Sequence, residues 1–212
     1  IRNLVIFFRK AELSLIMISK IHDRYGSAAI DIVSANPYRL IDDVSGIGFK
    51  TADEIAFKLG FEKDNIKRIT AALYYILDQL STEGHICYPF YKFLSKACRD
   101  LEISDELAQE GIEKLITENK FVLAGNKGTD EFYVYTSSLF RAEESTAFHL
   151  KELSEYRSGL FDNEKIIEHE VLSKFPYQPD LLQKQAVFAA LSNKVSIITG
   201  GPGTGKTTII SA

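Results

Sequence analysis

Residues 38–60, YRLIDDVSGIGFKTADEIAFKLG, decide the first part of the fold. Apolar side chains recur at helical spacing on both sides of the short stretch Ser45-Gly46-Ile47-Gly48. Ala52 allows close packing of the two predicted helices, and Gly60 is a natural stop for the second one. The order hydrophobic-x-Gly-hydrophobic-Gly between two helices predicts a helix-hairpin-helix element.

The turn of this hairpin is a candidate site for phosphate. Its two glycines permit a sharp turn with exposed backbone N–H groups, and the second helix adds the positive end of its dipole. We therefore expect a nucleic-acid backbone to contact Gly46, Ile47, Gly48, Lys50 and Thr51. Such contacts read no bases, so binding would be independent of sequence and sensitive to salt. The alternative is a packed helix pair whose glycines serve only the turn.

The residues on either side of the hairpin are also predicted to be helical. Short helices occupy residues 3–35, with breaks near Ala11–Leu13 and at Tyr25–Gly26, and Asn36-Pro37 forces a restart. The segment AELSLIMISKIHDRYG (11–26) has a similar outline without Gly-x-Gly, so it is a candidate degenerate partner of the first hairpin. A longer amphipathic helix at 65–82 completes a helix-hairpin-helix region over residues 1–84.

A second module is predicted over residues 85–157. Helices at about 90–101 and 104–118 precede FVLAG (121–125), the turn NKGTD and EFYVYT (131–136), which together predict a β-hairpin. Helix, helix and hairpin are the order of a winged-helix module, although a small scaffold without a partner fits the pattern equally well. Tyr133 and Tyr135 are candidate base-stacking residues. A connector helix at 137–157 leads to a linker at 158–180.

The stretch TGGPGTGKTT at 199–208 predicts a phosphate-binding loop of the Walker A type. A helix at 181–193 and a buried strand, VSIIT (195–199), precede it, so residues 181–212 read as the start of an α/β, RecA-like ATPase domain. Lys206 would reach the β- and γ-phosphates of ATP, and the Thr207 hydroxyl would ligate Mg²⁺. The residues expected to hold the nucleotide are Gly201, Pro202, Gly203, Thr204, Gly205, Lys206, Thr207 and Thr208.

The remainder of an ATP-hydrolysing site has no counterpart in the sequence. Hydrolysis needs an acidic residue on a neighbouring strand to hold Mg²⁺ and a group that orients the attacking water, and these lie on later strands of such domains. We therefore expect a mainly α chain with a small β-hairpin and a truncated ATPase domain, and we expect this chain alone not to turn over ATP.

Composition limits the class of protein. Hydrophobic residues make up 45% and charged residues 25%, as in ordinary globular proteins, and no apolar run is long enough to predict a membrane span. Two cysteines, Cys87 and Cys98, are too few for a disulfide framework, which favours reduced thiols and a cytoplasmic location. The net charge is −4, yet residues 1–70 hold 11 Lys/Arg against 9 Asp/Glu, which permits contact with phosphate.

Three blocks of the sequence resemble the long-form RecD-like helicases of superfamily 1, the RecD/TraA family, from their N-terminal region through the Walker A motif. These blocks are ANPYRLIDDVSGIGFKTADEIAFKLG (35–60), EGH (83–85) and LLQKQAVFAALSNKVSIITGGPGTGKTT (181–208). The resemblance implies an ATP- and Mg²⁺-dependent, DNA-stimulated motor that moves 5′-to-3′ on single strands, separates duplex at junctions and acts in recombination and repair.

The resemblance also implies that Gln183 hydrogen-bonds the adenine edge, whereas read locally Gln183 is a polar position on an amphipathic helix. The Mg²⁺-holding acid, the catalytic arginine and the second motor lobe of the family have no counterpart here. Two alternatives remain: a non-catalytic DNA-binding module with a vestigial loop, and another phosphate-binding-loop ATPase that remodels DNA. Gln183 and the upstream hairpin favour the helicase.

Overall fold

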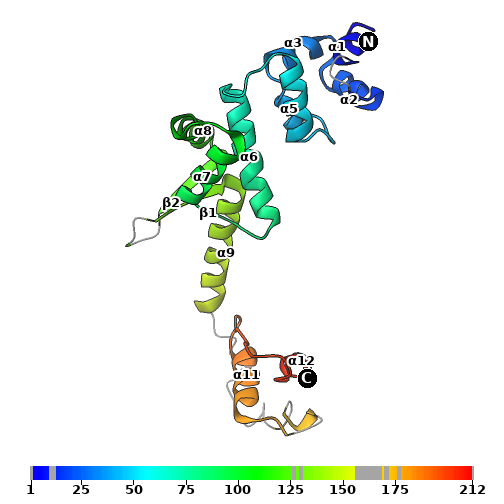
Figure 1. Ribbon diagram of the computed structural model, residues 1–212. Coiled ribbons are helices and arrows are strands. Elements are labelled where there is room, and N and C mark those ends of the chain that lie inside the picture. The colour runs from blue at the N-terminus through cyan, green and yellow to red at the C-terminus, as the bar shows by residue number, and fades with distance from the viewer. Residues whose placement is uncertain are drawn as a thin grey trace. The chain divides into compact units, whose positions relative to one another are not determined.

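The computed structural model describes residues 2–9, 13–125, 128, 131–155, 169, 172–175 and 178–211. It divides into two compact units, Ile1–Arg141 and Ala142–Ala212 (Figure 1). The first unit contains the helix-hairpin-helix region and the small sheet. The second contains the glycine-rich loop.

The N-terminal part of the first unit is a set of short helices around one core. These elements are α1 (Arg2–Arg9), α2 (Leu15–Tyr25), the 3₁₀ turn η1 (Gly26–Ala28), α3 (Ala29–Ala35), α4 (Arg39–Asp43) and α5 (Phe49–Lys58). The predicted breaks at Tyr25–Gly26 and Asn36-Pro37 are confirmed. Gly26 adopts a positive φ of 59°, and the Asn36 side chain accepts a hydrogen bond from the Tyr38 amide at 3.1 Å. Of the predicted break at Ala11–Leu13, only Leu13 is among the described residues, and it lies in no helix.

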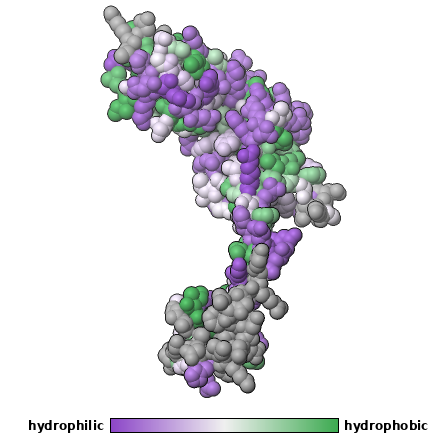
Figure 2. Space-filling view, turned by 180° about the vertical axis from the view of Figure 1, so that it is seen from behind, coloured by the Kyte–Doolittle hydropathy of each residue, from purple (hydrophilic) through white to green (hydrophobic). Residues whose placement is uncertain are grey.

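The predicted partner hairpin packs with the Gly-x-Gly hairpin. Leu4 and Phe8 of α1 and Ile18 and Ile21 of α2 share one buried core with α4 and α5. At the start of α2, however, Leu15 and Ile16 are exposed, and Figure 2 shows hydrophobic patches between hydrophilic ones on the surface of the first unit. Ile16 holds the helix position that Lys50 holds in α5. Only the second hairpin therefore presents a cation there.

The second core of this unit lies between three helices and the sheet. Its helices are α6 (Ile66–Thr82), α7 (Phe90–Leu101) and α8 (Asp105–Thr117). The Asn65 side chain caps α6 by accepting a hydrogen bond from the Lys67 amide at 2.9 Å. Phe49, the first residue of α5, packs against both cores. The two helical regions of this unit are thus joined through Phe49.

The sheet has three antiparallel strands in the order β1-β3-β2. Strands β2 (Phe121–Gly125) and β3 (Phe132–Thr136) form the predicted hairpin, with Leu123 opposite Val134. Sequence reasoning missed β1 (Tyr88–Pro89), which pairs with β3 on its other edge. Two residues, one of them proline, give no alternating pattern to detect. The order α7, α8, β2, β3 is the predicted order of helix, helix and hairpin. Helix α6, which the prediction assigned to the N-terminal region, packs in the same core as these elements.

The remaining elements are α9 (Ser137–Glu155), the 3₁₀ turn η2 (Leu172–Lys174), α11 (Leu181–Ser192) and α12 (Lys206–Ser211). None of the 19 residues of α9 is buried. Most of the predicted linker at 158–180 lies outside the described residues. No helix in the described part of the chain is long and apolar enough to cross a membrane.

The prediction of a buried strand at VSIIT (195–199) is wrong. These residues form no strand, and Ile197 is 86% exposed. A strand needs a neighbour to accept and donate its backbone hydrogen bonds, and the described residues of the second unit supply none. β-Branched composition alone therefore did not make this segment a strand.

Candidate functional site

The Gly-x-Gly turn between α4 and α5 is built on two buried apolar side chains. Val44 and Ile47 are each 3% exposed, and the Ile47 amide donates a hydrogen bond to the Val44 carbonyl at 3.1 Å. Gly46 takes a φ of 94°, which a residue with a Cβ adopts only at a cost. The Ile47 side chain therefore anchors the turn in the core, while Gly46 and Gly48 lie exposed at its surface.

The start of α5 offers unpaired backbone donors. Gly48 precedes the helix with extended backbone, its carbonyl accepts the first helical hydrogen bond from Ala52 at 3.1 Å, and no side chain caps the helix. The first amides of a helix have no acceptor within the helix itself. Lys50 is exposed in this first turn and Thr51 is half-buried. The structure thus brings Gly46, Gly48, Lys50 and Thr51 to one helix start.

A lysine that sequence reasoning missed lies beside the turn. The Lys20 ammonium of α2 donates a hydrogen bond to the Ser45 carbonyl at 2.9 Å. It would lie 3.5 Å from a Cβ placed on Gly46. Lys20 is 25 residues from Ser45, so no local pattern indicated the contact. Lys20 therefore places a positive charge beside the exposed turn, in addition to that of Lys50 at the start of α5.

A buried ion pair fixes the orientation of this hairpin on α6. Asp53 of α5 accepts hydrogen bonds from the Tyr38 hydroxyl at 2.6 Å and from Arg68 Nε at 3.0 Å. The Asp53 side chain is 14% and the Arg68 side chain 10% exposed. Burial raises the pKa of Tyr38, and the hydrogen bond to Asp53 raises it further. Because Arg68 also donates to the Lys63 carbonyl at 3.0 Å, the pair holds α5, α6 and the intervening loop together.

A second, more exposed cluster joins the two hairpins. Asp43 of α4 accepts hydrogen bonds from the Tyr25 hydroxyl at 2.6 Å and from Arg24 at 2.9 Å, both on α2. The hydrogen bonds from Tyr25 and Arg24 lower the pKa of Asp43. Arg39 lies 3.6 Å from the same carboxylate. This cluster orients α2, and with it Lys20, against the turn.

The winged-helix-like module presents an acidic helix. In helix-turn-helix proteins the second helix of the pair enters the major groove of DNA. Here that helix is α8, which carries one lysine and four carboxylates: Asp105, Glu106, Glu110, Glu113 and Lys114. A phosphate backbone would be repelled from such a face. The candidate stacking residues are also engaged, since the Tyr133 hydroxyl donates to Glu131 at 3.2 Å and Tyr135 packs edge-on against Phe140.

The glycine-rich loop folds around the Lys206 ammonium. Lys206 Nζ donates hydrogen bonds to the carbonyls of Gly200 at 2.5 Å and Gly201 at 2.6 Å, and the Thr204 hydroxyl donates to Gly201 at 2.9 Å. Gly203 and Gly205 both take a φ of 78°. Pro202 and Thr207 are exposed, and Thr208 is half-buried in α12. The loop therefore already has a lysine at its centre and the left-handed turns that only glycine adopts readily.

Gln183 contacts this loop, through bonds that sequence reasoning did not predict. Asp180 and Gln183 form a capping box at the start of α11. The backbone N–H of Gln183 donates to Asp180 Oδ1 at 2.8 Å, and the backbone N–H of Asp180 donates to Gln183 Oε1 at 3.1 Å. Gln183 Nε2 donates to the Thr204 carbonyl at 3.2 Å. The spacing Asp-x-x-Gln before an apolar helix is a sequence signal that could have identified Asp180. Both polar atoms of the Gln183 side-chain amide therefore form hydrogen bonds.

Comparison with known proteins matches both parts of the chain. Residues 1–87 match a family model described as the ATP-dependent RecD2 DNA helicase HHH domain, and residues 183–212 match one described as an AAA domain. The ATP-dependent RecD2 DNA helicase of Deinococcus radiodurans is 24% identical over 198 residues. The match covers 89% of this chain and 27% of that protein, so the chain spans about a quarter of the relative's length.

Proposed function

Because this chain is similar to the N-terminal region of RecD-like DNA helicases, we propose that it is part of an ATP-dependent helicase that moves 5′-to-3′ on single-stranded DNA in recombination and repair. The observation that carries the proposal is the presence, in one chain, of a hairpin with exposed turn glycines and a loop wrapped around a lysine ammonium. The proposed domains are residues 1–84, 85–157 and 181–212, with a linker at 158–180.

The hairpin is the proposed contact to DNA. Gly46, Gly48 and the first amides of α5 would bind a phosphate, while Lys50 and Lys20 would supply positive charge. The acidic α8 argues against binding through the neighbouring module, which leaves the hairpin as the favoured surface. Because none of these groups reads a base edge, the proposed binding is independent of sequence and applies to single strands and to junctions with duplex.

The glycine-rich loop is the proposed site for ATP and Mg²⁺. The fit rests on Lys206, which would exchange its loop carbonyls for phosphate oxygens, and on Thr207, whose hydroxyl is a hard oxygen ligand suited to Mg²⁺. Bound Mg²⁺ would neutralise charge that develops on the phosphates. The other residues assigned to the nucleotide are Gln183, Gly201, Pro202, Gly203, Thr204, Gly205 and Thr208.

Binding of fluorescent single-stranded DNA to the 212-residue chain tests the hairpin. Gly48 has a φ of −94° and open space around its Cβ position, so Gly48→Ala keeps the fold and only places a methyl group before the α5 amides. We expect Gly48→Ala to weaken binding. We expect Lys50→Ala to reduce the slope of log affinity against log salt by about 0.7. Lys92→Ala, which removes another exposed cation, from α7, is the matched control and should leave the slope unchanged.

ATP-dependent unwinding tests the motor. A protein of the relative's length that carries this sequence should separate a duplex with a 5′ single-stranded tail, and Lys206→Ala should abolish both unwinding and ATP hydrolysis. The 212-residue chain alone should release no phosphate from ATP. Mg²⁺-dependent hydrolysis by the pure chain, lost in Lys206→Ala, would show that it needs no further residues for catalysis.

A further inference from the structure

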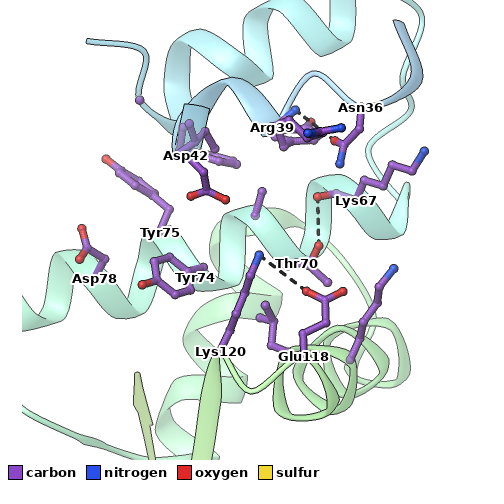
Figure 3. A pocket seen from close by; sticks show the side chains of 17 residues that line it. Asn36, Arg39, Asp42, Lys67, Thr70, Tyr74, Tyr75, Asp78, Glu118 and Lys120 are labelled. Carbon is purple, nitrogen blue, oxygen red and sulfur yellow. Dashed lines mark hydrogen bonds and ion pairs between the residues drawn. The ribbon is translucent and has the colours of Figure 1, made fainter. Parts of the chain in front are cut away.

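A pocket of about 460 Å³ lies beside the hairpin, and apart from Gly48 its lining residues have no part in the proposed function (Figure 3). One wall comes from α4 and the start of α5, the floor from α6, and the other wall from the end of α8 and the turn that leads from it to β2. Gly48 and Phe49 line it, so the pocket begins where the phosphate-binding turn ends. Its volume suits a ligand of the size of a small molecule and excludes a duplex.

Two tyrosine rings of α6 line the floor of this pocket, and each is stacked on a phenylalanine ring. Tyr74 stacks on Phe121 with ring centroids 6.0 Å apart, and Tyr75 stacks on Phe49 at 5.0 Å. Phe121 is 1% exposed, so it supports Tyr74 from within the core. Tyr74 itself remains 38% exposed. A planar ligand would therefore meet an aromatic surface that is already ordered.

The charges around the pocket are mixed. Its lining contains four cations, among them Lys114 and Lys120, and three carboxylates, Asp42, Asp78 and Glu118. Asp42 points into the pocket from the α4 side, and Lys120 points into it from the opposite wall (Figure 3). A ligand that is only anionic would meet the carboxylates. A nucleobase suits this lining better, because its amino groups can donate to carboxylates while the adjoining phosphates face the lysines.

We propose that this pocket accepts one unpaired nucleobase of a DNA strand whose neighbouring phosphate lies on the hairpin turn. The base stacks on the tyrosine floor, and the strand leaves past Lys114 and Lys120. Because the lining residue Gly48 also precedes α5, one strand can occupy both places without a gap. The inference rests on the proposed DNA binding at the hairpin, and it makes that binding selective for single strands over intact duplex.

Two ligands separate the pocket from the hairpin: a short fluorescent oligodeoxyadenylate, and an abasic oligonucleotide with the same number of phosphates. The 212-residue chain should bind the abasic strand about tenfold more weakly, since only the base uses the pocket. Tyr74→Leu, which keeps apolar packing on Phe121, should lose about the same factor on oligodeoxyadenylate and nothing further on the abasic strand. Tyr74→Phe keeps the ring and should bind as the parent does, and equal thermal melts of the three proteins verify the fold.

The outcomes are distinct. Equal binding of both strands by the parent chain, or an unchanged affinity of folded Tyr74→Leu, would overturn the pocket and leave the phosphate contact at the hairpin standing. Weaker binding of both strands by Gly48→Ala, together with a difference between the two strands in the parent, would support both. If the parent chain binds neither strand, both the proposed DNA binding and the pocket are overturned.

Discussion

Removal of the Asp53 carboxylate should destabilise the hairpin region by about 3 kcal/mol. Asp53→Ala leaves the Arg68 guanidinium 10% exposed and without its ionic partner, and breaking a buried pair from one side costs about 3–5 kcal/mol. The lower end applies because Arg68 keeps its hydrogen bond to the Lys63 carbonyl and its position over the Phe57 ring. The Tyr38 hydroxyl also loses its acceptor.

Urea unfolding followed by far-ultraviolet circular dichroism measures this loss. Tyr38→Phe in a separate protein isolates the hydroxyl contribution, which should be about 1.5–3 kcal/mol for a bond to a charged acceptor. Glu102→Gln is the exposed control, because the Lys63–Glu102 pair is shorter, at 2.7 Å against 3.0 Å, but its side chains are 64% and 72% exposed. That control should cost less than about 1 kcal/mol.

Removal of both charges of the buried pair should cost less stability than removal of one. Arg68→Met combined with Asp53→Leu removes both charges, so it should be less destabilising than Asp53→Ala alone. Equal small losses for Asp53→Ala and Glu102→Gln would refute the reasoning, because burial would then make no difference to the two pairs.

Three other changes test the packing and titration of the first unit. Gly111→Ala should destabilise it by on the order of 1 kcal/mol in urea unfolding, since the new Cβ would lie 2.7 Å from both Ile69 and Leu73; an increase in stability would mean that α6 and α8 can separate at no cost. Burial, followed by the hydrogen bond to Asp43, raises the pKa of Tyr25 from 10 to about 12, so its stabilising contribution is complete below pH 10 and is lost as pH rises through 12. Tyr25→Phe should therefore flatten the dependence of the unfolding free energy on pH over that interval, and an unchanged slope would count against the contact. Burial and the hydrogen bond to Asp105 raise the pKa of Cys98 to about 11. In Cys87→Ser the remaining thiol should therefore react slowly with iodoacetamide near neutral pH and reach half its maximal rate near pH 11. A midpoint near pH 9 would contradict the effect of burial on this thiol.

The elements that could be predicted from the sequence are those specified by neighbouring residues. Asn36-Pro37 ends α3, Gly46 takes the positive φ of the hairpin turn, and the apolar segments on either side of an Asn/Gly/Asp-rich turn give β2 and β3. In each case the residues that determine the conformation lie within a few positions of it. Strand β1 had no such signal, because its two residues are ordered by their pairing with β3 rather than by their own pattern.

The supports of the candidate sites depend on contacts between distant residues. Lys20 reaches the turn across 25 positions, and Asp53 and Arg68 pair across 15. Nothing in the local sequence distinguishes Arg68 from its exposed neighbour Lys67, because the burial of Arg68 is a consequence of how α5 packs. The wrong strand at 195–199 has the same origin, since strand formation needs a partner segment that propensity does not supply.

Gln183 shows how one residue can satisfy a local pattern and a family pattern at once. Its amide completes the capping box with Asp180 and bonds the Thr204 carbonyl of the loop, each interaction worth about 0.5–1.5 kcal/mol. The contact between Gln183 and adenine remains a prediction, and it would require the side-chain amide to give up its hydrogen bonds to Asp180 and Thr204. An adenine edge presents one donor and one acceptor to an amide, so it could replace these two bonds one for one. A base edge without one donor and one acceptor would leave a polar atom of the Gln183 side chain without a hydrogen bond. The capping contacts would therefore contribute to the selectivity of the predicted site for adenine over other bases.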